Sequence, residues 1–253
     1  MHLGPNSPKT ANAFYQFLQQ AKHEAQALIL CGDIFNAWIG ADLAMDPPPW
    51  LAHAIYNFRD AALDLPIYFM RGNRDFLLDS RFAQYVGAQM LDDQILLQTD
   101  HHQVLLTHGD ELCTDDKAYQ AFRRKVRNKK IQKLFLKLPI LWRQRIAGGL
   151  RKKSAATQRN QTYDLISDVN DMSCLQFLEQ HQQQILIHGH THRPALHKIK
   201  NPAGQYFSRI VLPDWEYDHS TPTRAGWLAL QTDGQIALHR LHQPTVRFRL
   251  KKN

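Results

Sequence analysis

Four short polar clusters stand out in this 253-residue chain, each directly after a run of apolar residues. They read GD ending at Asp33, GNRD ending at Asp75, HGD ending at Asp110 and GHTH ending at His192. Together they supply carboxylates, an amide oxygen and several imidazoles, which are donors for borderline divalent metals such as Mn, Fe and Zn. Any one cluster alone is better explained as a helix cap, a turn or a hydrogen-bonded histidine. The ordered series predicts a metal site.

The apolar runs in front of these clusters predict the elements that position them. Each run has four to six residues and is bounded by glycine, which is typical of a buried strand. Helical patterns lie between the runs, at 12–25, 50–63 and 168–182. This alternation predicts an α/β fold. Because ligands in open α/β sheets collect outside the carboxyl ends of the strands, we expect the four clusters to meet at one edge.

The last third of the chain has a different pattern. Three apolar runs follow one another at 206–212, 226–232 and 235–241, and the last two are joined across an Asp-Gly turn signal. A second sheet packed on the first would account for these three runs.

Charge is concentrated in one segment of the chain. The formal net charge is +8, and residues 117–163 hold fifteen of the 31 Lys and Arg residues but no Asp or Glu. We interpret the chain as a single domain, 1–253, with a basic helical lid inserted at 117–165. A basic segment of this kind predicts an anionic partner.

Cysteine usage and hydropathy limit where the protein works. The three cysteines are scattered and odd in number, which argues against a disulfide framework and for the cytoplasm. No apolar run is long enough for a membrane span, and no signal peptide precedes the first helix pattern. We therefore expect a protein that neither spans a membrane nor is exported.

The order GD, GNRD, HGD and GHTH resembles the pattern of the calcineurin-like metallophosphoesterase superfamily. The resemblance covers nearly the whole chain and implies a sandwich of two mixed β-sheets flanked by helices, with two divalent metal ions. By the same resemblance, the carboxylate of Asp33 bridges both metals. One metal site would then take Asn73, His108 and His188, and the other would take His2 and His190. His192 is left as a residue that supports the ligands from behind.

The first residues of the chain fit only part of the family's opening D-x-H motif. His2 matches the histidine, Met1 matches the middle position, and the aspartate would fall one residue before Met1. We expect either a start codon assigned too far downstream or a truncated chain. If the chain is native as it stands, stability and activity should both suffer, and an inactive scaffold is an alternative.

Longer stretches such as GDIFNAWIGAD, GNRDFLL and IHGHTHRPALH resemble the UDP-2,3-diacylglucosamine pyrophosphatases of the lipid A pathway in Gram-negative bacteria. This resemblance implies hydrolysis of UDP-2,3-diacylglucosamine at its α-phosphate, most often with Mn²⁺, by a peripheral protein at the anionic cytoplasmic face of the inner membrane. Arg74, Asn73 and His188 are then the expected catalytic residues. The expected substrate contacts are Asn73, Arg74, Asp116, Ser154 and His188.

Several alternatives remain open at this stage. The apolar lid residues between Leu134 and Trp142 could hold acyl chains, or they could form the buried face of an ordinary amphipathic helix. Arg74 could contact phosphate or pair with Asp75. Another phosphodiester or nucleotide is an alternative substrate. The lid carries mostly Leu and Ile rather than the spaced aromatic side chains that single-stranded nucleic acids require, so no nucleic-acid partner is expected. The oligomeric state is not predicted.

Overall fold

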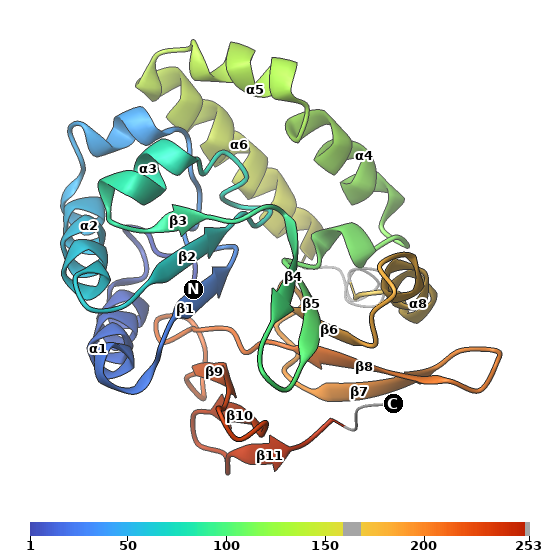
Figure 1. Cartoon of the computed structure of the whole chain (residues 1–253). Coiled ribbons are helices and arrows are strands. Elements are labelled where there is room, and N and C mark those ends of the chain that lie inside the picture. Colours follow the sequence, from blue (N-terminus) through green and yellow to red (C-terminus); the bar gives the residue numbers. More distant parts are fainter. Residues whose placement is uncertain (159–167, 251–253) are drawn as a thin grey trace.

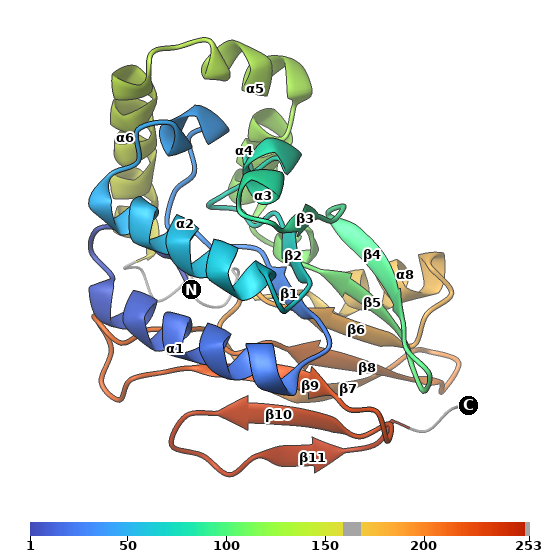
Figure 2. The same cartoon turned by 60° about the vertical axis from the view of Figure 1, so that its left-hand side comes forward.

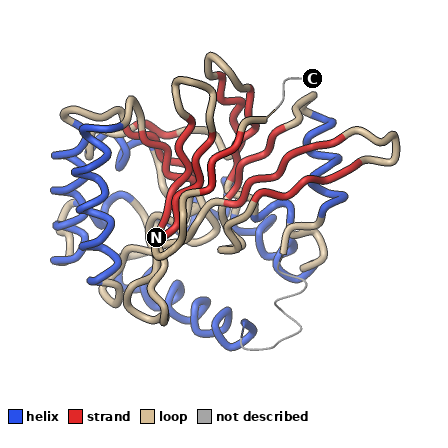
Figure 3. The backbone as a smooth tube through the Cα atoms, turned by 90° about the horizontal axis from the view of Figure 1, so that it is seen from below, coloured by secondary structure: helices blue, strands red, loops and turns tan. Residues whose placement is uncertain are grey.

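The structure, a computed structural model, describes residues 1–158 and 168–250, without the side chains of 152–158. Strands lie in the middle of the molecule, with helices on either side (Figure 3). The strands form three hydrogen-bonded sheets. Helices α1 (Pro8–Glu24), α2 (Pro49–Ala62) and α3 (Ser80–Tyr85) pack on one side, and α8 (Asp171–Gln180) packs on the other (Figure 1).

The first sheet is parallel and carries two of the polar clusters. It consists of β1 (Leu28–Cys31), β2 (Ile67–Met70) and β3 (Gln89–Met90), with β2 in the middle. Cys31 lies opposite Met70 in the ladder, so β1 and β2 end side by side. The apolar runs before GD and GNRD are therefore strands, as predicted.

The second sheet has five strands in the order β4-β5-β6-β8-β7. Their bounds are β4 (Gln94–Gln98), β5 (Gln103–Thr107), β6 (Ile185–His188), β7 (Leu196–Lys200) and β8 (Tyr206–Val211). The central strands β5, β6 and β8 are parallel, while β4 and β7 are antiparallel edges. Thr107 lies opposite His188, so the strands before HGD and GHTH also end side by side.

The third sheet is antiparallel and contains β9 (Gly226–Leu230), β10 (Ile236–Arg240) and β11 (Val246–Phe248). The expectation that the runs from 206 to 241 form one sheet is wrong in one respect, because β8 joins the five-stranded sheet. Four of its six residues are buried, which suits a central position better than an edge. In the described residues, one face of the sandwich consists of two small sheets rather than one mixed sheet.

The three sheets pack face to face around a shared apolar core. That core joins Met70 of β2 to Leu106 of β5, Ile187 of β6 and Ile236 of β10. A larger cluster lies between the first sheet and helices α1 and α2, where Phe14 and Phe58 are fully buried. A third cluster joins the five-stranded sheet to α8. The architecture is therefore a layered sandwich with helices outside.

The segment predicted as a lid is helical as far as it is described. A short helix, η2 (Asp110–Leu112), follows β5, and the chain then forms α4 (Lys117–Val126), α5 (Lys129–Leu136) and α6 (Ile140–Gln158). Another short helix, η1 (Ala41–Ala44), lies earlier in the chain, between β1 and α2. The three long helices arch over one end of the sandwich (Figures 1 and 2). Asn128 caps α5 through the N–H groups of Lys130 and Ile131, which separates α4 from α5. No helix in the described part of the chain is both long and apolar enough to cross a membrane.

Candidate metal centre

The carboxyl ends of four strands bring the polar clusters together. Asp33 follows β1, Asn73 follows β2, His108 follows β5 and His190 follows β6. The amide oxygen of Asn73 is 3.0 Å from Nε2 of His108 and 3.0 Å from Nδ1 of His190. The Asp33 carboxylate is 3.6 Å from the same His108 nitrogen. Residues from both face-to-face sheets therefore converge on one point.

A second group lies on the other side of the Asp33 carboxylate. Nδ1 of His2 is 3.9 Å from Oδ2 of Asp33, and Nε2 of His2 is 3.4 Å from Nε2 of His192. The other nitrogen of His192 faces Asp214 at 3.5 Å. Asp33 thus stands between two sets of imidazoles, which is the position expected of a bridging carboxylate.

The loops that carry these residues have unusual backbone geometry. Asp33, His190 and His192 have φ angles of 52°, 64° and 55°, in the left-handed region that non-glycine residues seldom occupy. Such positions persist where the surroundings impose them, and they concentrate at functional sites. A Cβ on Gly32 would lie 2.6 Å from the backbone nitrogen of Gly72, so only glycine allows the two loops to approach this closely.

Asp75 organises the backbone beneath the cluster. Its side chain is fully buried, and its two oxygens accept four backbone N–H groups, two each. The donors are Asp33 at 3.1 Å, Ile34 at 2.7 Å, Phe35 at 3.2 Å and Gly72 at 2.7 Å. Burial, together with the charge of Asp33, raises the pKa of Asp75 to about 6. This role of Asp75 was not predicted from the sequence, although the residue is the last one of GNRD.

Electrostatics already give Asp33 and His190 the protonation states that metal binding requires. Burial alone would raise the pKa of Asp33, but the positive charges of His108, His2 and Arg74 outweigh it and hold that pKa below its ordinary value. Burial and the charge of His108 lower the pKa of His190 to about 4. A charged carboxylate and a neutral imidazole are the protonation states in which these groups bind metals.

The structure contradicts the predicted position of His188. Nδ1 of His188 is 2.9 Å from the carbonyl of Gly189, and Nε2 faces the guanidinium of Arg209 at 3.4 Å. Burial and the Arg209 charge lower its pKa to about 3, so the ring is neutral, with Nδ1 donating to the carbonyl and Nε2 accepting from Arg209. Both nitrogens are therefore engaged away from the cluster.

The correction shifts the histidine pair by two residues. GHTH begins at Gly189, so its histidines are His190 and His192, and these are the two that reach the cluster. The strand β6 ends at His188, and the turn after it points the next two histidines toward the ligands. The sequence already gives these two histidines, because GHTH spans 189–192, and the resemblance was placed two residues too early at His188 and His190.

The other predicted contacts lie around the cluster. The backbone N–H of Arg74 donates to Oδ1 of Asp33 at 2.8 Å, and its Nε is 3.9 Å from the same carboxylate, so the alternative pairing with Asp75 is not found. Asp116 is buried and caps α4 by accepting the N–H of Tyr119 at 2.8 Å. The backbone of Ser154 lies in α6, but its side chain is outside the described part of the structure.

Comparison with known proteins identifies the family of this chain. Residues 1–194 match the family model described as calcineurin-like phosphoesterase. The chain belongs to this family. The predicted superfamily and the α/β fold class are therefore confirmed.

Relatives of this phosphoesterase carry one name. A protein of Bordetella parapertussis named UDP-2,3-diacylglucosamine hydrolase is 47% identical over 234 residues, which cover 92% of this chain and 90% of that protein. A protein of the same name from Salmonella arizonae is 43% identical over 223 residues, covering 87% and 90%. The predicted resemblance to this group of enzymes is thus confirmed.

A search of solved structures found Vacuolar Protein Sorting 29 from Cryptosporidium parvum. The match covers 98% of this chain and 92% of that chain at 12% identity. Its TM-score of 0.47 is too low to support an inference.

The residues of the cluster fit a metal ion even though they hydrogen-bond to one another here. Among the described residues, no three His, Cys, Asp or Glu side chains are placed to hold a metal by themselves, and the first group depends on the Asn73 amide oxygen. The fit is clearest at His2, whose buried Nδ1 has no hydrogen-bond partner in the described structure. Its 3.9 Å separation from Asp33 is too long for a hydrogen bond. It suits two ligands of one ion, since each would lie about 2.0–2.2 Å from the metal.

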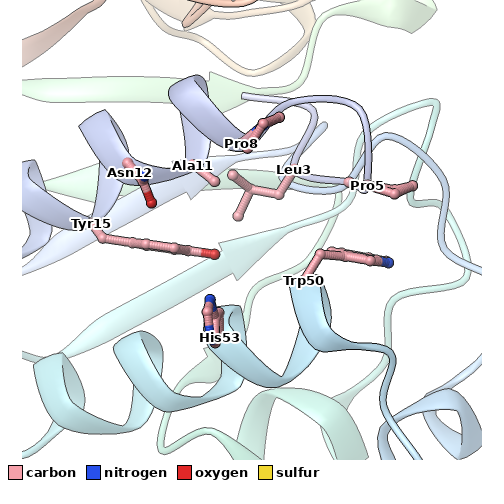
Figure 4. Close-up of a pocket in the computed structure, with 9 residues that line it drawn as sticks. Leu3, Pro5, Pro8, Ala11, Asn12, Tyr15, Trp50 and His53 are labelled. Carbon is pink, nitrogen blue, oxygen red and sulfur yellow. The ribbon is translucent and has the colours of Figure 1, made fainter.

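A small pocket lies next to the N-terminal segment but apart from the cluster. It has a volume of about 90 Å³ and is lined by residues of that segment, α1 and α2 (Figure 4). Tyr15, Trp50 and His53 face into it (Figure 4). The pocket is lined neither by Asp33 and Asn73 nor by any of the four histidines that converge on them.

Proposed function

We propose that this phosphoesterase hydrolyses the pyrophosphate bond of UDP-2,3-diacylglucosamine in lipid A biosynthesis. Water would attack the α-phosphorus, the bond from that phosphorus to the bridging oxygen would break, and the products would be UMP and 2,3-diacylglucosamine 1-phosphate. The names of relatives that are 42–47% identical over at least 87% of the chain support this substrate. The structural observation that best supports it is that a set of metal-type ligands lies beside a lid that is both basic and apolar.

The proposed ligands fall into two sets that share Asp33. One set adds Asn73, His108 and His190, and the other adds His2 and His192. His188 is not part of this revised proposal. We propose two divalent ions, most often Mn²⁺, because imidazole, carboxylate and amide donors suit borderline metals. When bound, such a pair supplies a nucleophilic water near neutral pH and neutralises charge on the phosphoryl group.

Arg74 is the residue proposed to hold the reacting phosphate. Its side chain is partly exposed, and its backbone N–H keeps Asp33 oriented at 2.8 Å. A guanidinium beside the ligands can donate two hydrogen bonds to non-bridging phosphate oxygens, where charge accumulates in the transition state. The leaving group is itself a phosphate monoester, so it can depart without a strong general acid.

The lid is tied directly to the loops of the metal centre. Arg127 of the α4–α5 junction donates to the carbonyl of Gly72 at 3.2 Å and pairs with Asp93 at 3.0 Å. Arg123 of α4 pairs with the buried Asp110, which follows His108 by two residues. Part of the lid's positive charge therefore holds the lid in place rather than facing a ligand.

The apolar residues of the lid divide into two groups. Phe135, Leu136 and Ile140 pack against the main core, whereas Leu134 and Trp142 are 69% and 60% exposed. We propose that the exposed group, together with the surrounding lysines and arginines, meets acyl chains and the anionic surface of the inner membrane on its cytoplasmic side. An amphipathic face with basic residues around it favours binding in this way.

The test is hydrolysis of UDP-2,3-diacylglucosamine in water enriched in ¹⁸O, after chelation and after reloading with Mn²⁺. The expected result is Mn²⁺-dependent release of UMP that carries the label, because attack at the α-phosphorus puts the water oxygen on UMP. Label in the diacylglucosamine 1-phosphate would contradict the proposed attack. Turnover of dinucleoside polyphosphates but not of this substrate would favour the alternative nucleotide function.

A further inference from the structure

Arg143 is the buried exception in the exposed half of the lid. It lies in the second turn of α6 and is 2% exposed, whereas its neighbours Leu141 and Trp142 are largely exposed. Its Nη1 donates to the carbonyl of Ile39 at 2.6 Å and to the carboxylate of Asp42 at 2.8 Å. Nη2 donates to the other Asp42 oxygen, and Nε donates to the carbonyl of Leu138 at 2.9 Å. The guanidinium is thus held from three directions.

The core side forms a fitted socket for this guanidinium. Gly40 has a φ of 134°, and a Cβ there would collide with Nη1 of Arg143. The same Cβ would lie 2.7 Å from Oδ1 of Asp42 and 2.9 Å from Leu136. The socket therefore requires both the unusual backbone and the missing side chain of glycine, which a general surface contact would not need.

Beyond the socket, the middle of α6 is packed only lightly: Ala147 touches the main core, but the two glycines that follow it face open space. A Cβ on Gly148 or on Gly149 would meet no atom within 4 Å, so neither glycine is there to allow close packing. Two glycines inside a helix weaken it by about 1 kcal/mol each relative to alanine. Two turns after Arg143, the side chain of Arg151 reaches down to Asn36, three residues after Asp33 in sequence. The weak part of the helix lies between these two arginines.

We infer that Arg143 is a positioning residue for the substrate. Its contacts with Ile39 and Asp42 beside Gly40 fix the start of α6. The helix then runs over the metal centre despite its glycine pair and presents Arg151 at Asn36. Arg143 does not touch the reacting phosphate. It acts by holding the lid surface that faces a lipid-bearing substrate, and this step rests on the proposed function.

The experiment compares Arg143→Met with Arg145→Met, an exposed arginine of the same helix. In Arg143→Met, KM for UDP-2,3-diacylglucosamine should rise about tenfold, equivalent to about 1.4 kcal/mol, with kcat changed less than about twofold. Hydrolysis of bis(p-nitrophenyl) phosphate, which has no acyl chains, should stay as in the parent enzyme. Amide hydrogen exchange at 144–151 should speed up, while β5 and β6 stay protected.

A double variant that adds Asp42→Asn tests whether Arg143 acts through its contact with Asp42. If Arg143 acts through this contact, Arg143→Met with Asp42→Asn should have the same KM as Arg143→Met alone, whereas additive losses would contradict the inference. Equal behaviour of the 143 and 145 variants, or an equal loss on the aryl diester, would overturn it. If the parent enzyme cleaves the aryl diester but not the lipid substrate, the proposed function fails, and hydrogen exchange still decides whether Arg143 anchors α6.

Discussion

Replacing Asp75 should lower the free energy of unfolding more than replacing a surface carboxylate does. Asp75→Ala leaves the buried N–H groups of Asp33, Ile34, Phe35 and Gly72 without their acceptor. An unpaired buried donor costs about 1–3 kcal/mol, and since the loops would relax and admit water, we expect a total loss of about 4 kcal/mol. Asp75→Asn keeps one oxygen, which can serve two of the four donors, so about 2 kcal/mol should be lost.

The assay is urea unfolding followed by circular dichroism, with EDTA present so that metal binding does not add to stability. The matched control is Asp79→Ala, which removes one capping bond, from Phe82 at 3.2 Å, and an exposed ion pair with Arg81 at 2.8 Å, and should cost about 1 kcal/mol. The free energies of unfolding should therefore fall in the order Asp79→Ala, Asp75→Asn, Asp75→Ala. If Asp75→Ala lost no more than the Asp79 control, the assignment of Asp75 as the organiser of the two loops would be refuted.

Three further outcomes are expected. His192→Ala should lower the Mn²⁺ bound per chain, measured by plasma mass spectrometry after dialysis, while His188→Gln should keep it. Loss of metal in His188→Gln with full retention in His192→Ala would restore the sequence-based assignment. Replacing Leu141 and Trp142 by Ser should weaken flotation with anionic liposomes but leave hydrolysis of bis(p-nitrophenyl) phosphate intact, and unchanged flotation would argue against a membrane-facing lid. Gly148→Ala should stabilise α6 by about 0.5–1 kcal/mol, seen as slower amide exchange in the helix, since the added methyl meets no atom; faster exchange would show that the glycine is needed.

The elements that carry the site were predictable because their patterns are local. Apolar runs ending in glycine marked β1, β2, β5 and β6, and the order of the polar clusters indicated a common edge. Two strands were missed: β3 has only two residues, and the apolar run of β4, Ile95–Leu97, is only three residues long. The membership of β8 was misjudged because strand pairing depends on contacts between distant parts of the chain.

Within the candidate site, residue types were easier to predict than residue positions. Asp33, Asn73 and His108 follow strand ends directly, and the structure brings them together. The histidine pair was predicted two residues too early, at His188 and His190, although GHTH spans 189–192. The structure places His190 and His192 in a turn with left-handed φ angles after β6.

By itself, the sequence determined which donors this protein has, their order along the chain and the family they belong to, because strand-end motifs are short and contiguous. The tertiary structure alone decided which imidazoles face Asp33, that the Asp75 carboxylate gathers four backbone donors, and that Arg143 is buried whereas Arg145 of the same helix is exposed. Each of these depends on groups that are mostly tens of residues apart in the sequence lying close together in space. Only the packing of the two strand layers and the lid brings them to that distance.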